Sequence, residues 1–118
     1  MSVGWIAVDF DGTLVTYDKW VAPTNVGEPI QPMIDRVRQW LGEGKKVRIF
    51  TARVYAPLND AARQEEAALA MLTIQTWCSQ QFGKILPVTC SKDFGMIELW
   101  DDRCVQLEPN TGERVVRP

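Results

Sequence analysis

The chain contains no histidine. This absence excludes serine–histidine–aspartate and cysteine–histidine triads, histidine-bound metals and histidine proton shuttles. Catalysis would have to use carboxylates, amines, guanidinium groups, hydroxyls, thiols or a metal held by oxygen. Cysteine is scarce too: Cys78, Cys90 and Cys104 form no Cys-x-x-Cys pair, which argues against a disulfide framework and a cysteine-rich zinc site. We therefore expect a reduced, cytoplasmic location.

Long apolar runs and an excess of one charge are also missing. The first residues carry no basic segment, and the longest apolar run elsewhere covers only residues 67–72. We therefore expect neither a signal peptide nor a membrane helix, and no membrane partner. Fifteen acidic residues against 13 basic ones give a net charge of −2. This balance offers no broad basic field for nucleic acid, although a local phosphate site remains compatible with it.

The residues that are present fit one small globular domain. Of 118 residues, 46% are hydrophobic and 24% are charged, which are ordinary values for a folded chain and speak against disorder. No internal repeat, low-complexity tract or linker divides the sequence. Residues 1–118 are therefore expected to form a single domain around one core.

Hydrophobic patterning predicts alternating strands and helices. Their order is typical of an α/β fold, a Rossmann-like three-layer sandwich with a mostly parallel central sheet. Only five residues separate the last two strands, fewer than a parallel crossover usually needs. Either this connection runs back in extended form, or one of the two strands is wrongly assigned. The predicted elements are strands at 3–10, 45–51, 86–90 and 96–100, a loop at 15–32, helices at 33–41 and 60–82, and a C-terminal β-hairpin around the turn 109–112.

Two carboxylates, Asp9 and Asp11, follow the first predicted strand and precede Gly12. Ligands of open parallel sheets bind at the carboxyl ends of the strands. Close carboxylates repel one another and need a cation or a shared proton, and Mg²⁺ is a natural partner for such oxygens. Gly12 allows a sharp turn with exposed amides. A plain Asp-Gly turn is the alternative, whereas a calcium loop is excluded because its twelfth residue would be Trp20.

A second acidic pair, Asp101 and Asp102, follows the predicted strand 96–100. If this strand and the first one are parallel, both acidic pairs reach the same edge of the sheet. The result would be a metal site made only of oxygen ligands. A solvated turn after a strand is the alternative for this pair.

Two further polar positions complete the pattern. Thr51 ends the second predicted strand, so its hydroxyl and the amides of Ala52 and Arg53 could hold phosphate oxygens. Lys92 could supply a fixed positive charge, with Lys84 as a second candidate. Each has an ordinary structural alternative, because threonine is common in strands, lysine is usually solvated and arginine often forms surface ion pairs.

Taken in order, these positions resemble the motifs of the haloacid dehalogenase-like (HAD) superfamily, whose phosphohydrolases use an aspartate nucleophile. The resemblance spans residues 5–103, nearly the whole chain. The first motif matches Asp9–Leu14, the second Thr51, the third Lys92, and the fourth Asp101 with Asp102.

The resemblance implies a phosphatase mechanism that needs no histidine. Asp9 would attack phosphorus to form an aspartyl-phosphate, and Asp11 would protonate the leaving oxygen and then deprotonate water. Thr51 and Lys92 would hold the phosphoryl oxygens. Mg²⁺ would be bound by Asp9, by the backbone carbonyl of Asp11, by Asp101 and, through water, by Asp102. Further substrate contacts are expected at Gly12, Thr13, Ala52 and Arg53.

The chain lacks room for the cap domain that many members of this superfamily carry. Residues 15–32 are too few for one, and residues 54–91 are mostly a helix and a strand. We therefore expect a capless, open site for a phosphorylated small molecule or an accessible macromolecular phosphate. Arg103 flanks this site as phosphate ligand or surface ion pair, and Trp20 would either stack on substrate or pack.

Alternatives to hydrolysis stay open at this point. A phosphotransferase on the same fold would pass the phosphoryl group to another acceptor. A non-catalytic receiver-like module, phosphorylated on aspartate, has a different order of motifs, and a degenerate binding module would not need all four polar positions. The sequence does not reveal the oligomeric state.

Overall fold

The computed structural model describes residues 4–116. The strand predicted at 3–10 therefore begins at Val3, outside the described residues. The observed elements are β1 (Trp5–Val8), α1 (Gln31–Gly42), β2 (Lys46–Phe50), the short 3-10 helix η1 (Ala52–Val54), α2 (Ala61–Phe82), β3 (Val88–Thr89) and β4 (Met96–Trp100).

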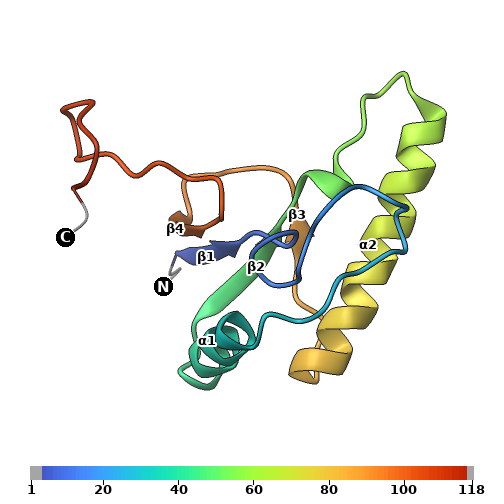
Figure 1. The fold of residues 1–118 in the computed structure, drawn as a ribbon, viewed down its shortest axis with the longest axis horizontal. Coiled ribbons are helices and arrows are strands. Elements are labelled where there is room, and N and C mark those ends of the chain that lie inside the picture. The colour runs from blue at the N-terminus through green and yellow to red at the C-terminus, as the bar shows by residue number, and fades with distance from the viewer. Residues whose placement is uncertain (1–3, 117–118) are drawn as a thin grey trace.

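The four strands form one sheet in the order β3-β2-β1-β4, and every neighbouring pair is parallel. Figure 1 shows β1 between β2 and β4. The central strand β1 is buried along its whole length, as its continuous apolar run predicts. The expected α/β, Rossmann-like architecture with a parallel central sheet is confirmed.

Both long helices pack on one face of the sheet. The chain moves from β1 to β2 and on to β3 in the same direction, and right-handed crossovers therefore bring α1 and α2 to the same side. Helix α1 begins at Gln31, two residues before the predicted start, because Pro32 is accommodated in its first turn. Asp60 caps α2, and its side chain accepts a hydrogen bond from the Arg63 amide. The core includes Ile6, Val8, Phe10, Ile34, Val37, Val47, Ile49, Ile74, Trp77 and Leu86.

The connection between β3 and β4 answers the question raised by its shortness. Both predicted strands exist, although β3 is reduced to Val88–Thr89, and residues 90–95 run back in extended form. Trp5 Nε1 donates to Asp93 Oδ1 over 2.8 Å, and Arg48 Nη1 lies 3.5 Å from Asp93 Oδ2. Trp5 and Arg48 alternate with core residues along their strands, so this segment lies on the face of the sheet opposite to α1 and α2.

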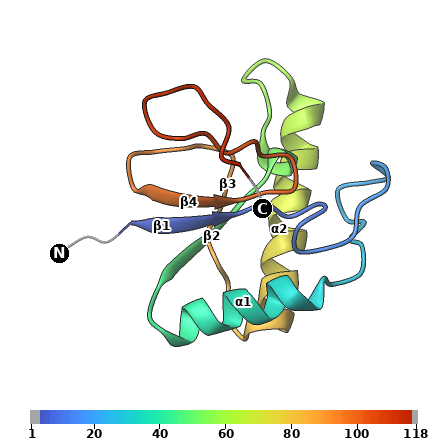
Figure 2. The same ribbon diagram turned by 60° about the vertical axis from the view of Figure 1, so that its left-hand side comes forward.

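The chain ends in the expected C-terminal hairpin, whose pairing is short. Leu107 and Arg114 form an antiparallel bridge, and the Val115 amide donates to the Gln106 carbonyl. Figure 2 shows this hairpin beyond β4, away from the two long helices. No cap domain is inserted: the described residues between β1 and α1 form only a loop with isolated bridges. Within residues 4–116, neither helix has the length and apolarity needed to cross a bilayer.

Asp93→Ala is expected to lower the urea midpoint of unfolding, because the buried indole N–H of Trp5 would lose its acceptor. Asp93→Asn keeps an oxygen for the indole and for the Gly95 amide, and should stay closer to the wild-type midpoint. Asp35→Ala, on the exposed side of α1, is the control. Equal midpoints for Asp93→Ala and wild type would show that this anchor contributes nothing.

Candidate functional site

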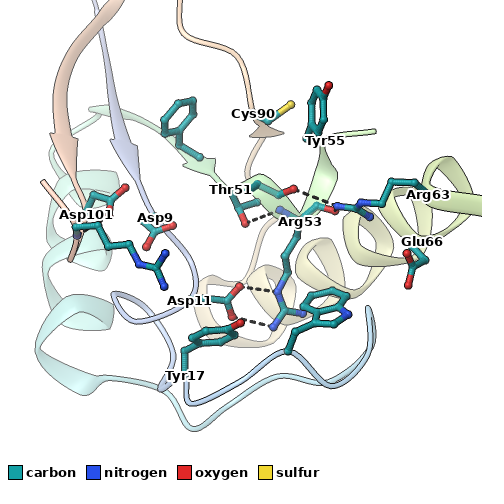
Figure 3. A pocket seen from close by; sticks show the side chains of 14 residues that line it. Asp9, Asp11, Tyr17, Thr51, Arg53, Tyr55, Arg63, Glu66, Cys90 and Asp101 are labelled. Carbon is teal, nitrogen blue, oxygen red and sulfur yellow. Dashed lines mark hydrogen bonds and ion pairs between the residues drawn. The ribbon is translucent and has the colours of Figure 1, made fainter. Parts of the chain in front are cut away.

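Three carboxylates converge where β1 and β4 end. The Asp9 amide donates to the Trp100 carbonyl over 2.9 Å, which continues the pairing of the two strands and sets Asp9 beside Asp101. Oxygen atoms from Asp9, Asp101 and Asp102 all lie within 4.8 Å of one another. Figure 3 shows Asp9 and Asp101 next to each other at the strand ends. The two acidic pairs of the sequence therefore contribute to one cluster.

The turn after β1 is held tightly against Asp102. Thr13 Oγ1 donates to Asp9 Oδ2 and accepts from the Asp102 amide, both over 3.2 Å. Gly12 has φ +84°, and a Cβ there would collide with the Asp102 carboxylate, so only glycine fits this approach. The amides of Gly12 and Thr13 bond to carbonyls within the turn. These two amides, expected to face substrate, are thus engaged inside the protein.

Electrostatics at this cluster favour a cation. Burial and the neighbouring Asp101 charge, together with a hydrogen bond shared with Asp102, raise the pKa of Asp9 to about 7. Three carboxylates this close either share a proton or bind a positive ion. An all-oxygen set with a net negative charge suits Mg²⁺, so Asp9, Asp101 and Asp102 fit the predicted metal. The Asp11 side chain is not part of this cluster.

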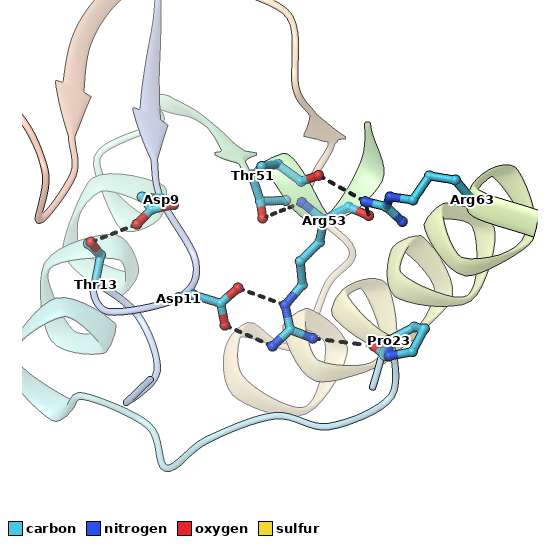
Figure 4. A network of polar contacts seen from close by, with 8 residues as sticks. Asp9, Asp11, Thr13, Pro23, Thr51, Arg53 and Arg63 are labelled. Atoms are coloured by element: carbon cyan, nitrogen blue, oxygen red, sulfur yellow. Dashed lines mark hydrogen bonds and ion pairs between the residues drawn. The ribbon is translucent and has the colours of Figure 1, made fainter. Parts of the chain in front are cut away.

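Asp11 instead forms a buried ion pair with Arg53. Arg53 Nε donates to Asp11 Oδ2 over 2.7 Å, and Nη2 donates to Oδ1 over 2.8 Å (Figure 4). The third arm, Nη1, reaches the Pro23 carbonyl at 3.3 Å. The guanidinium also lies over the rings of Phe10 and Trp20, 5.4 and 5.1 Å from their centroids. Arg53 was expected to bind substrate; in the structure its donors hold Asp11 and the loop.

The segment after β2 links this pair to α2. Thr51 is buried and its Oγ1 accepts from the Arg53 amide, which caps η1. Arg63 Nη2 donates to the carbonyls of Ala52 and Arg53, at 3.2 and 3.0 Å. Arg63 Nη1 is buried without a hydrogen-bond partner among the described residues. The backbone around Thr51 is therefore fixed by the first turn of α2.

These groups line one open cavity of about 710 Å³. Lys92 and Lys84 are exposed and are not among its lining residues. Arg103 does line it, as do residues that the sequence reasoning did not single out, namely Tyr17, Tyr55, Arg63 and Glu66. The sequence does carry a signal for Arg63 and Glu66. They lie three residues apart in the first turns of a helix that follows a parallel strand, and the starts of such helices lie at the ligand-binding edge of the sheet. Of the catalytic, substrate-binding and metal-binding residues predicted from the sequence, those that line the cavity are Asp9, Asp11, Thr51, Ala52, Arg53 and Asp101.

Comparison with known proteins supports the fold. No family model matches the sequence, and no curated protein matches it. A solved structure of a conserved protein from Bacteroides thetaiotaomicron is similar, with a TM-score of 0.56 and 21% sequence identity. The similarity covers 88% of this chain and 79% of that chain. At this identity the likeness concerns the fold alone.

The stability of the metal-free protein should fall as the pH rises from about 4 to about 7. The pKa of Asp9 in the folded state lies above its ordinary value of 3.8. As the pH rises, Asp9 therefore ionises in the unfolded chain before it ionises in the folded protein, and this lowers the free energy of the unfolded state relative to the folded state. Asp9→Asn should flatten this fall. The measurement is the free energy of urea unfolding against pH in a chelator. A slope that is the same in wild type and Asp9→Asn would exclude this cause.

Arg53→Met should destabilise the protein by about 1.5–3 kcal/mol, because it removes the charge-assisted hydrogen bonds that the part-buried Asp11 carboxylate accepts. The side chains of Arg53 and Asp11 are only 5% and 19% exposed. The double variant Arg53→Met/Asp11→Asn should recover part of this loss, and Lys45→Met, at an exposed surface pair, serves as the control. Urea unfolding of wild type, Arg53→Met, Asp11→Asn and the double variant gives the coupling energy. A coupling near zero would contradict a buried ion pair.

Proposed function

We propose that the protein is a Mg²⁺-dependent phosphohydrolase of the HAD-like type, which cleaves a phosphomonoester through an aspartyl-phosphate. The supporting observation is the convergence of Asp9, Asp101 and Asp102 at the carboxyl edge of the sheet, on a cavity that Asp11 and Thr51 also line. Neither the carboxylate cluster nor the cavity alone would support the proposal. The order of the motifs in the sequence predicts that both lie at the same edge of the sheet.

The carboxylates would hold the metal in two ways, directly and through water. Asp9 and Asp101 would bind Mg²⁺ directly with the Asp11 carbonyl, and Asp102 would bind through water. When bound, the ion would offset the repulsion between the carboxylates and the phosphate, and would stabilise charge on the transferring group. Thr13 would keep Asp9 oriented through its 3.2 Å hydrogen bond to Oδ2.

The proposed reaction has two steps. An Asp9 carboxylate oxygen attacks phosphorus, the bond from phosphorus to the ester oxygen breaks, and the leaving oxygen takes a proton from Asp11. Water then attacks the aspartyl-phosphate, gives a proton to Asp11 and releases inorganic phosphate, which restores both residues. Both Asp11 oxygens accept from Arg53, so the acid step requires one of these oxygens to leave Arg53 and to carry a proton that it gives to the leaving oxygen.

The phosphoryl oxygens need donors and positive charge. Thr51 and the backbone at Ala52 line the cavity and would supply a hydroxyl and an amide. Lys92 follows β3 by three residues and best matches the third motif position, although it is exposed and does not line the cavity. Arg103 lines the cavity and follows Asp101 and Asp102, so it is the second candidate for the cation.

A phosphotransferase is the second candidate function. The open cavity of about 710 Å³ has room for an acceptor alcohol, which would replace water in the second step. Release of inorganic phosphate without an acceptor separates hydrolysis from transfer.

Wild type should release phosphate from p-nitrophenyl phosphate only with Mg²⁺, and Asp9→Asn should lower kcat by about a thousandfold or more because it removes the nucleophile. Asp35→Asn, far from the cavity, should behave as wild type. Lys92→Ala and Arg103→Ala should then identify the cation, since the one that binds the phosphoryl group should lose about a hundredfold. Release that is independent of metal, or that survives in Asp9→Asn, would contradict the proposal.

A further inference from the structure

The wall of the cavity beyond the carboxylates carries three aromatic side chains. Tyr17, Trp20 and Tyr55 are 41%, 43% and 56% exposed, and all three line the cavity. They come from two separate segments, the loop after β1 and the end of η1. Figure 3 shows Tyr17 beside Asp11 and Tyr55 beyond Thr51. Aromatic rings usually bury their faces, so three accessible ones at one cavity point to a flat, apolar ligand face.

Trp20 is held in place rather than free. The Arg53 guanidinium lies 5.1 Å from the centroid of its ring, and Arg53 is itself fixed by Asp11 and the Pro23 carbonyl. A platform fixed in this way loses little conformational entropy when a ring stacks on it.

Polar groups suited to a heterocyclic edge line the same cavity. Arg63 and Glu66 come from the first turns of α2 and line the cavity. Glu66 supplies acceptor oxygens. Arg63 Nη1 is a buried donor without a partner among residues 4–116, so it would reach a ligand only after its side chain changes rotamer. Nucleobases combine a π-face with both acceptors and amino donors on their edges. A simple sugar phosphate would leave this donor, acceptor and aromatic set largely unused.

We infer that the cavity binds a nucleoside phosphate, with its phosphoryl group at Asp9 and its base against the aromatic side chains that line the cavity, Tyr17, Trp20 and Tyr55. This inference rests on the proposed function and names the substrate class of the same site. The cavity of about 710 Å³ is within the range of small-molecule sites. The net charge of −2 favours a free nucleotide over a long polyanion.

The test compares AMP with ribose 5-phosphate, which has the same phosphorylated sugar without the base. Wild type should prefer AMP at least about tenfold in kcat/KM, since stacking of one base is worth about 1–3 kcal/mol. Tyr55→Leu should remove most of this preference and leave ribose 5-phosphate unaffected, whereas Tyr55→Phe should retain it. Phe94→Leu, a fully exposed aromatic outside the cavity, is the control. Equal kcat/KM for the two substrates would overturn the inference and leave the proposed function standing.

Calorimetric binding of AMP to Asp9→Asn separates the two proposals. Binding that Tyr55→Leu weakens in this background, with no hydrolysis of any phosphate by wild type, would support the nucleotide site and contradict the phosphatase. A lack of AMP binding at millimolar concentration would overturn the site. A 5′-phosphorylated oligonucleotide is the last probe. If the protein dephosphorylates this oligonucleotide but not AMP, and if Tyr55→Leu weakens that activity, the substrate is a nucleoside phosphate at the end of a nucleic-acid strand.

Discussion

The parallel pairing of β1 with β4 sets three carboxylates against one another, and the surrounding structure accommodates this conflict. The Asp9 amide is bonded to the Trp100 carbonyl, so Asp9 cannot move away from Asp101 without breaking the sheet. Thr13 ties the same carboxylate to the Asp102 backbone, and Gly12 provides the close approach that a side chain would prevent. Burial and repulsion together raise the pKa of Asp9 to about 7. Carboxylates held this close are relieved either by a shared proton or by a bound cation.

Arg53 is a second residue on which the arrangement depends. Its guanidinium pairs with Asp11 after β1, donates to the Pro23 carbonyl and lies against Trp20. Its backbone amide donates to Thr51, and its carbonyl accepts from Arg63. One buried charge therefore positions both the acidic turn and the wall of the cavity. Because a buried pair is costly to break on one side, the loop after β1 and the start of α2 are coupled through it.

Much of the architecture could be predicted from local pattern. The apolar run of β1, the helical periodicity of 60–82 and the acidic pairs at strand ends each carry a signal within a few residues. The extended return at residues 90–95 was one of two options, and its anchor at Asp93 depends on Trp5 and Arg48, which are far away in sequence. The Arg53–Asp11 pair spans 42 positions, so the sequence alone left Arg53 as a phosphate ligand or a surface ion pair. Tyr17 and Tyr55 carry no motif, and only the folded cavity brings them together.

The central claim is that Asp9 is the nucleophile of this carboxylate cluster, and trapping of the covalent intermediate tests it most directly. The protein would be incubated with Mg²⁺ and p-nitrophenyl phosphate, reduced with borohydride, digested and sequenced by mass spectrometry. Borohydride reduces an aspartyl-phosphate to homoserine. Homoserine at position 9, dependent on Mg²⁺, is the predicted result. Homoserine at another aspartate, or turnover of the substrate with no homoserine at all, would contradict the account.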